Sequence, residues 1–195
     1  MWTSGNAFSE DLLCNIVRRI ASIPDLANNI RFIFQRGGIG TTYYKLKDIK
    51  NVEMRFFDYL SYTDFLRLMK VPDVVINPMV IDDLGRINCI NKEAFFNAKS
   101  EMKYIYGGVM KKCVISSPQP SYCYAINHGK TGFICNNIDE WIDCIAECVS
   151  NRDMVYRIGM NAYIDIKIRY NVASRVKELF KFLGIDYGGI EHVQS

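Results

Sequence analysis

Short apolar, β-prone runs alternate with amphipathic, helix-like segments along most of this 195-residue chain. The strand candidates are residues 30–34, 52–57, 72–78, 113–117 and 131–135, and the helix candidates are residues 12–20, 63–70, 97–112, 121–128, 137–149 and 172–183. Such alternation builds βαβ units, in which each helix carries the chain to a parallel neighbouring strand. The pattern therefore predicts an α/β fold with a doubly wound, mostly parallel sheet and helices on both faces.

A chain of this length can bury one core, and no internal repeat or linker divides it. We therefore expect residues 1–195 to form a single Rossmann-like domain. Sheets of this class bind ligands at the carboxyl ends of their strands, beside helix N-termini. The segments that follow the predicted strands are the places to look for a site: residues 35–40, 57–61, 77–100 and 117–122.

Charge and hydropathy exclude several functional classes. The 24 basic and 21 acidic side chains are too evenly balanced for a nucleic-acid-binding protein, which would carry a basic stripe. No apolar run is long enough to span a membrane, and the N-terminus lacks the pattern of a signal peptide. We accordingly expect a cytoplasmic protein that does not bind nucleic acid.

The seven cysteines are odd in number and form no Cys-x-x-Cys pair, and several lie in apolar runs. This usage predicts reduced thiols that pack as small apolar side chains. Cys144 and Cys148 are one helical turn apart, which could suit a metal ion. The two histidines, His128 and His192, are not at ligand spacing from them, so we expect no metal.

The segment NAKSEMK, at residues 97–103, opens a helix just past the carboxyl end of a predicted strand. A helix N-terminus offers free N–H donors and about half a positive charge, so it attracts phosphate. Lys99 and Lys103 add full charges and Ser100 adds a hydroxyl, which together suit a diphosphate. The alternative is that both lysines belong to an ordinary solvated helix face.

Other polar segments give weaker signals. Ser4 and Gly5 could form a small nest of backbone N–H groups above the sheet. Residues 118–122 read as a rigid, proline-set loop in which Tyr122 could stack on a ligand, donate a hydrogen bond or pack on the helix that follows. No Gly-x-Gly-x-x-Gly is present, and Gly37-Gly38-Ile39-Gly40 is interpreted as a flexible loop. His128 precedes a turn glycine and is expected to be a helix C-cap rather than a catalytic base.

Several motifs occur in a fixed order: DVVINP at 73–78, FNAKSEMKYI at 96–105, CVISS at 113–117, HGKTGFI at 128–134, and Glu140-Trp141. This series resembles the C-terminal half of GT-B-fold glycosyltransferases of group 1, the retaining, family-4-like enzymes. In that family FN-x-AKS-x-x-K is followed by an apolar strand that ends in Ser, then by an N/H-G-x-T-G turn. Arg157, Asn161-Ala162 and Tyr170 are similar to its C-terminal tail, so the resemblance runs from about Ser4 to Leu183.

The resemblance implies a domain that holds a nucleotide-diphosphate sugar, the donor substrate, without a cofactor or metal. Lys99, Ser100 and Lys103 would lie at the diphosphate, with Lys103 as the catalytic charge partner. The 57–60 loop, which contains Tyr59, would border the base, and Ser4 and Gly5 would match the phosphate-side loop after a first strand that is nearly absent here. Tyr122 and Tyr106 complete the expected donor-site residues.

The same resemblance implies that a glycan or other acceptor is bound mainly by a preceding domain, which is absent from this chain. We therefore expect the isolated 195 residues to be inactive in glycosyl transfer. Association of the full-length protein with a membrane surface stays open as an alternative.

Two departures from the family pattern bear on the function. Tyr106 stands where the family has a glutamate that holds the ribose hydroxyls, and Lys111-Lys112-Cys113 replaces the usual Gly-x-Pro at the end of the helix. A tyrosine can donate one hydrogen bond or stack, but it cannot accept two hydroxyls as a carboxylate does. The first hypothesis is the donor-binding half of a retaining glycosyltransferase. The alternatives are a non-catalytic, degenerate module that acts as a partner or scaffold, and an unrelated Rossmann-like enzyme of sugar phosphates or nucleotides.

Overall fold

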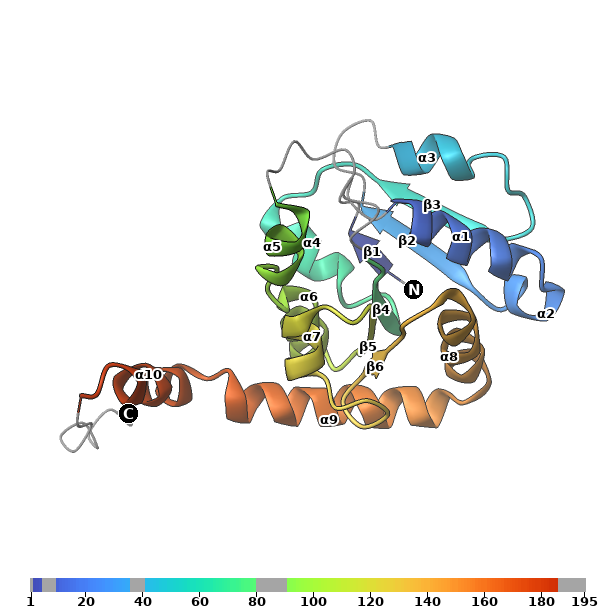
Figure 1. Cartoon of the computed structure of the whole chain (residues 1–195). Helices are drawn as coiled ribbons and strands as arrows, with labels where there is room; N and C mark the ends of the chain where they lie inside the picture. Colours follow the sequence, from blue (N-terminus) through green and yellow to red (C-terminus); the bar gives the residue numbers. More distant parts are fainter. Residues whose placement is uncertain (1, 5–9, 36–40, 80–90, 186–195) are drawn as a thin grey trace.

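The computed structural model describes residues 2–4, 10–35, 41–79 and 91–185. Within these ranges six parallel strands form one sheet in the order β3-β2-β1-β4-β5-β6 (Figure 1). They are β1 (Trp2–Ser4), β2 (Arg31–Gln35), β3 (Glu53–Phe57), β4 (Val74–Asn77), β5 (Cys113–Ser116) and β6 (Phe133–Ile134). The winding reverses between β1 and β4, which is the doubly wound order that the alternation of strands and helices predicts.

The helices connect successive strands and cover both faces of the sheet (Figure 1). They are α1 (Glu10–Ala21), α2 (Pro24–Ala27), α3 (Thr41–Leu46), α4 (Tyr62–Leu68), α5 (Lys92–Asn97), α6 (Met102–Val109), α7 (Pro120–Ala125), α8 (Ile138–Ser150), α9 (Arg152–Arg169) and α10 (Val172–Phe182). Among the helices that the structure describes, none is both long and apolar enough to cross a membrane.

The strands divide their side chains between two hydrophobic cores. In β5, Cys113 and Ile115 point into the core beneath α1, α2 and α8, whereas Val114 points into the core beneath α6 and α7. Successive residues of a strand face opposite sides, so a strand buried on both faces reads as a continuous apolar run. The C-terminal half of α9 packs in the second core and its N-terminal half in the first, so this helix belongs to both.

Polar caps fix several helix ends where the sequence predicts them. Asn137 caps α8 by accepting the Glu140 N–H at 3.0 Å, and the Glu140 carboxylate reaches back to the Asn136 N–H at 2.8 Å. The predicted end of the last helix at Gly184 is also confirmed, since this glycine has φ of 68° just after α10.

Some expectations about individual elements were wrong. The helix α9 was not predicted, and α5 lies in a stretch that was interpreted as polar and irregular. The first strand is present rather than nearly absent: three residues suffice for β1 because its neighbours β2 and β4 pair with it on both sides.

The segment around α7 also differs from its prediction. Pro120 occupies the first turn of α7, where a missing N–H costs nothing, so the helix starts inside the expected rigid loop. The chain then leaves the helix at Ile126, which is extended. His128 is therefore not a C-cap; its Nδ1 accepts the Ile134 N–H at 3.1 Å instead.

The cysteines agree with the prediction of unpaired thiols. All six in the described part of the chain are free, and only Cys123 among them is exposed. Cys144 and Cys148 lie in α8, near Cys113 and Cys135, yet no group of described residues has the geometry to hold a metal ion. Cys89 lies outside the described residues.

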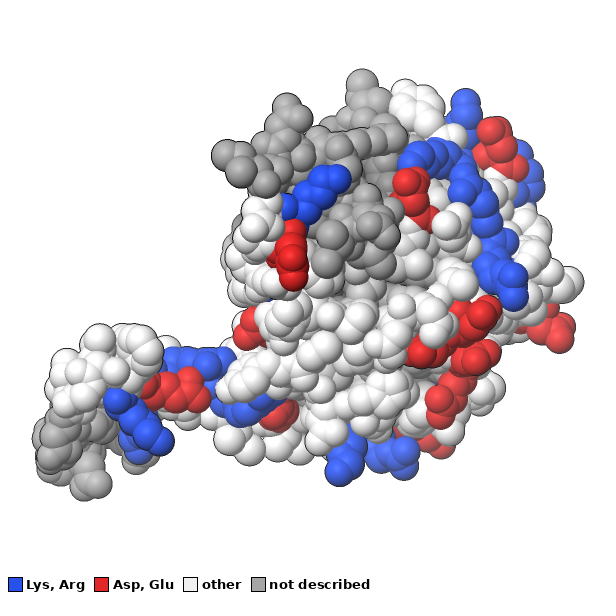
Figure 2. All heavy atoms as spheres, viewed as in Figure 1, with Lys and Arg blue, Asp and Glu red and all other residues white. Residues whose placement is uncertain are grey.

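Charged side chains of opposite sign lie on neighbouring helices. Figure 2 shows basic side chains over α1 and acidic side chains over the adjacent α8, and Arg19 and Asp139 pair between these helices at 3.5 Å. Both partners are largely exposed, so this pair contributes at most about 1 kcal/mol.

The turn after α6 is unusual and closely packed. Lys111 has φ of 58°, the left-handed conformation that glycine favours, and the N–H groups of Lys111 and Lys112 donate to the carbonyls of Gly108 and Gly107 at 2.9 and 2.8 Å. Gly159 of α9 lies directly against the Lys111 carbonyl, where a β-carbon would fall well inside van der Waals contact. The long helix can approach β5 this closely only because residue 159 lacks a side chain.

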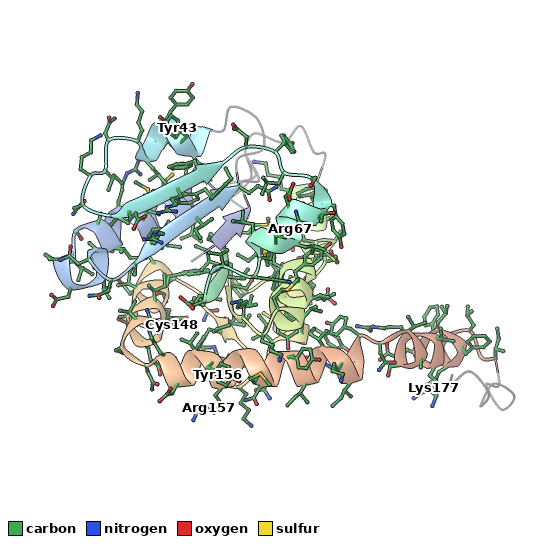
Figure 3. The ribbon with its side chains drawn as sticks, turned by 180° about the vertical axis from the view of Figure 1, so that it is seen from behind. Tyr43, Arg67, Cys148, Tyr156, Arg157 and Lys177 are labelled. Atoms are coloured by element: carbon green, nitrogen blue, oxygen red, sulfur yellow. The ribbon has the colours of Figure 1, made fainter. Side chains whose placement is uncertain are left out.

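We expect Gly159→Ala to lower the free energy of unfolding by about 1–3 kcal/mol, the usual cost of overpacking. Alanine also has a higher helix propensity than glycine, by about 1 kcal/mol, which acts in the opposite direction. We expect the free-energy cost of the clash with the Lys111 carbonyl to exceed this gain. Urea denaturation measures the difference. Arg157→Ala, on the exposed side of the same helix (Figure 3), serves as the control and should change stability by less than about 0.5 kcal/mol. A stabilised Gly159→Ala protein would contradict this packing.

Candidate functional site

Buried polar side chains gather where β4 and β5 end. In the part of the chain that the structure describes, the buried polar residues are Asn77, Ser116, Ser117 and Gln119. Burying a polar group is unfavourable unless it is hydrogen-bonded, so a cluster of this kind needs a structural or functional reason. The cluster lies at the carboxyl edge of the sheet, beside the point where the strand order reverses.

Asn77 is the centre of this cluster and is only 2% exposed. Its amide nitrogen donates to Ser116 Oγ and to Gln119 Oε1, both at 3.0 Å. Its amide oxygen accepts from the Lys103 ammonium at 2.9 Å. One side chain therefore joins the ends of β4 and β5 to the starts of α6 and α7.

The N-terminus of α6 points into the same region, where the Tyr122 hydroxyl accepts one of its N–H groups. Glu101 is the N-cap residue, but its side chain makes no capping hydrogen bond. Its carboxylate instead accepts the Tyr170 hydroxyl at 2.8 Å. No acidic residue lies in the first turn of α6, and the carboxylate of the N-cap residue is hydrogen-bonded to Tyr170 rather than to the N–H groups of the helix.

Lys103 brings a full positive charge to this helix end. Burial lowers the pKa of its ammonium from 10.5 to about 8, and the nearby Lys99 charge adds to the decrease. No carboxylate of the described residues contributes to this shift. The ammonium is therefore poorly solvated and is held by the neutral oxygen of Asn77, which makes it a strong partner for an incoming anion.

The loop before α6 places a second lysine nearby. The Lys99 ammonium lies 4.2 Å from the centre of the Phe95 ring, a cation–π contact with α5. The Lys99 carbonyl accepts from Ser121 Oγ at 2.5 Å, which ties this loop to the first turn of α7. Tyr122, also in α7, is buried, and its hydroxyl accepts the Lys103 N–H at 3.3 Å.

A pocket of about 260 Å³ lies among these groups. Its lining residues are Phe65, Asn77, Met79, Lys99, Ser100, Met102, Lys103, Tyr106, Gln119 and Tyr122. It combines two ammonium groups, a helix N-terminus and aromatic rings. The ammonium groups and the helix N-terminus could bind an anion, and the aromatic rings could stack on a flat ring.

A larger hollow of about 1070 Å³ lies at the opposite edge of the sheet. It is lined by the first residues of three strands, Arg31, Glu53 and Val74. Amino ends of parallel strands are not where sheets of this class bind ligands, and the polar cluster is not there. We therefore place the candidate site in the smaller pocket.

The longest helix holds α6 in position beside the pocket. The Tyr104 hydroxyl donates to Asp165 Oδ2 at 2.7 Å, and Arg169 donates to both oxygens of the same carboxylate at 2.8 and 2.7 Å. Hydrogen bonds to charged groups contribute about 1.5–3 kcal/mol each when they are sheltered from water. The orientation of α6, and with it the position of Lys103, depends on this contact with α9.

Five of the residues predicted for the site surround the pocket: Lys99, Ser100, Lys103, Tyr106 and Tyr122. The structure does not bring Tyr59 to them; this residue is 79% exposed and is not among the lining residues. Ser4 ends β1 at the same edge of the sheet, and Gly5 lies outside the described residues. The assigned roles of all these residues stay predictions.

Five lining residues were not among the predicted site residues: Phe65, Asn77, Met79, Met102 and Gln119. Asn77 could have been found from its position, because it is a polar residue at the end of a buried apolar strand and directly before a proline. Gln119 and Phe65 carry no such local signal, since only the packing of α7 and α4 brings them to the pocket.

A scan of the sequence against protein-family models finds no match, and a search of curated proteins finds none either. Solved structures do match the fold. The Anabaena protein Alr3699/HepE, in complex with UDP and glucose, is similar with a TM-score of 0.67 and 14% identity; the match covers 94% of this chain and 47% of that one.

Two further structures give the same result. The C-terminal domain of a group 1 family glycosyl transferase, LpcC from Francisella tularensis, matches with a TM-score of 0.63 and 12% identity over 88% of this chain and 85% of that domain. A glycosyltransferase from Rickettsia africae matches with a TM-score of 0.64 and 16% identity over 93% of this chain and 46% of that one.

This chain thus spans about half the length of HepE and of the Rickettsia protein, and nearly the whole LpcC domain. It has the fold of the C-terminal half of a GT-B glycosyltransferase, as the sequence motifs predicted.

The environment of Lys103 predicts a specific dependence of stability on pH. Because the pKa falls from 10.5 in the unfolded chain to about 8 in the folded one, the unfolded state binds more protons between these values. The contribution of Lys103 to the free energy of unfolding should therefore increase with pH across that interval. We expect the free energy of unfolding of the unmutated protein, relative to that of Lys103→Met, to increase from pH 8 to 10.5 in urea titrations. Parallel pH profiles for the two proteins would contradict the proposed burial.

Proposed function

We propose that this chain, which has the fold of a glycosyltransferase C-terminal half, binds a nucleotide-diphosphate sugar as the donor of a glycosyl transfer. One observation carries the proposal: the poorly solvated Lys103 ammonium lies beside the N-terminus of α6, whose N-cap residue makes no capping hydrogen bond, in a pocket at the carboxyl edge of the sheet.

The chemistry of this pocket fits a diphosphate. Phosphate oxygens accept hydrogen bonds from the free N–H groups of a helix N-terminus, and the dipole favours their negative charge. The ammonium groups of Lys103 and Lys99 add charge, and the Ser100 hydroxyl adds a donor. A bound anion also stabilises the protonated form of Lys103, so binding would raise the pKa of this group again.

The structural comparisons support the same class of ligand. HepE has been solved with UDP and glucose and with UDP-glucose. Because this chain is only 14% identical to HepE, the likeness extends to the fold, and a UDP-type donor is part of the proposal.

In the proposed reaction, the bond between the donor sugar and the diphosphate breaks, and negative charge develops on the departing phosphate oxygen. Lys103 and the α6 N–H groups would stabilise that charge, which is the transition-state role of preorganised donors. We assign the catalytic role to Lys103 on this basis. The scheme draws its positive charge from the chain itself, so it needs no metal, and it suits a retaining transfer.

The acceptor, a glycan or another molecule, would be bound by a further domain, because this chain spans about half the length of HepE. The isolated chain should therefore bind the donor without multiple turnover. We expect the reaction to occur in the cytoplasm, with association at a membrane surface as an open alternative.

A second candidate is a non-catalytic module that keeps the fold and has lost donor binding. Tyr106 favours it, because no carboxylate among the described lining residues can hold a ribose diol. Nucleotide binding separates the two candidates.

Calorimetric titration with UDP and UDP-glucose tests the proposal. We expect micromolar binding, unchanged by a chelator, and a loss of about tenfold to hundredfold in Lys103→Ala, since a charge-assisted hydrogen bond contributes about 1.5–3 kcal/mol. Lys181→Ala, which removes the same charge from the exposed end of α10, is the control and should bind as the unmutated chain does.

A folded chain that binds no nucleotide diphosphate would exclude the donor-binding role and favour the non-catalytic module. Binding that does not change in Lys103→Ala would show that the ligand lies elsewhere. Multiple turnover by the isolated 195 residues would contradict the need for a further domain.

A further inference from the structure

The residue that begins α6 has its carboxylate bound outside the helix. Glu101 is the N-cap residue, the position from which a polar side chain commonly accepts the N–H groups of the first turn. Its side chain makes no such hydrogen bond and accepts instead from the Tyr170 hydroxyl at 2.8 Å. The chain thus carries a negative charge at the start of the helix where the diphosphate is proposed to bind, and holds that charge at another group.

Tyr170 is fixed in place at the end of α9. It is the C-cap residue of that helix, and its N–H donates to the Ile166 carbonyl at 2.9 Å. Its ring packs against the second core and against the Arg175 guanidinium, which lies 4.2 Å from the ring centre. Burial and the hydrogen bond to the Glu101 carboxylate raise the pKa of Tyr170, so its hydroxyl stays protonated and remains a donor.

Other contacts already hold α6 against α9. The Tyr104 hydroxyl donates to Asp165 Oδ2 at 2.7 Å, and Gly108 lies directly against Ala162 at the crossing of the two helices. The hydrogen bond from Tyr170 to Glu101 adds a third link between these helices. Its separate effect is to determine where the Glu101 carboxylate lies.

A Glu101 carboxylate without this hydrogen bond would have favourable partners at the start of α6. Negative charge is stabilised by the N–H groups and the dipole of a helix N-terminus. The Lys103 ammonium, held by the neutral amide oxygen of Asn77, lies in the same first turn. These are the groups that the proposed function assigns to the diphosphate, so an internal carboxylate would compete with the ligand for them.

We propose that Tyr170 is a positioning residue of the donor site: by binding the Glu101 carboxylate, it keeps the chain's own negative charge off the N-terminus of α6 and leaves that position to the diphosphate. This inference rests on the proposed donor-binding function. Tyr170 is 69 residues from Glu101 in the sequence and is not among the lining residues of the pocket, so it acts through Glu101.

Calorimetry on the full chain with UDP and inorganic pyrophosphate tests the inference. Tyr170→Phe keeps the ring and releases the carboxylate, so we expect it to weaken both ligands by about threefold to thirtyfold. Glu101→Gln removes the charge and should bind both at least as tightly as the unmutated chain. The double variant should bind as Glu101→Gln does, because the amide carries no charge that competes with the ligand.

Tyr156→Phe is the matched control. It removes a hydroxyl from an exposed position of the same helix, α9 (Figure 3), beside the hollow at the opposite edge of the sheet. It should leave both affinities unchanged.

The titration of the Lys103 ammonium, followed by NMR of labelled lysine, gives a second measurement that needs no ligand. If Glu101 turns to the start of α6 in Tyr170→Phe, its charge should raise the pKa of Lys103 above about 8. The same titration in the double variant should show no such increase.

The possible failures are distinguishable. A loss of affinity that persists in the double variant would show that the Tyr170 hydroxyl is merely structural and would overturn the inference, with donor binding intact. A loss of less than threefold in Tyr170→Phe, or an unchanged pKa of Lys103 in that variant, would overturn it as well. If the unmutated chain binds neither UDP nor pyrophosphate, the proposed function fails and the inference fails with it.

Discussion

The hydrogen bond between the Lys103 ammonium and Asn77 Oδ1 is the contact on which the arrangement of the candidate site depends. It fixes a positive charge at the end of β4 without a negative partner among the described residues. Asn77 can hold it because its own amide nitrogen is occupied by Ser116 and Gln119, which determines which way the amide oxygen points. The charge is thereby positioned in advance and is poorly solvated, the two properties that favour capture of an anion.

This arrangement requires that four segments meet at one place. A parallel sheet brings the ends of β4 and β5 together at one edge, and the connections that leave this edge start α6 and α7 there. The helix α9 then braces α6 through Tyr104, Asp165 and Arg169, on the side away from the pocket. The fold therefore supplies the position of each group, while the chemistry of the site comes from a few polar and aromatic side chains.

Much of this could be predicted from local sequence. Buried parallel strands appear in the sequence as apolar runs, so β5 was predicted close to its observed bounds. Asn137 and Gly184 mark helix ends by their capping chemistry, so the start of α8 and the end of α10 were also predicted. The helix α9 escaped prediction because it carries exposed apolar residues, Ile164 and Ile168, which blur the contrast between its faces. The Lys103–Asn77 contact spans 26 residues of sequence, and the contact between the Phe65 and Tyr106 rings joins two helices, so neither has a local signature.

The helix α10 follows α9 but stands away from the sheet (Figure 1), and none of its residues is buried. The helix α9, by contrast, contributes to both hydrophobic cores, so neither face of the sheet can open without disturbing the other. Loss of structure in this chain should accordingly occur in two separate events. The terminal helix can fray alone, at little cost, whereas the remainder melts as one cooperative unit, and only the second event abolishes the pocket.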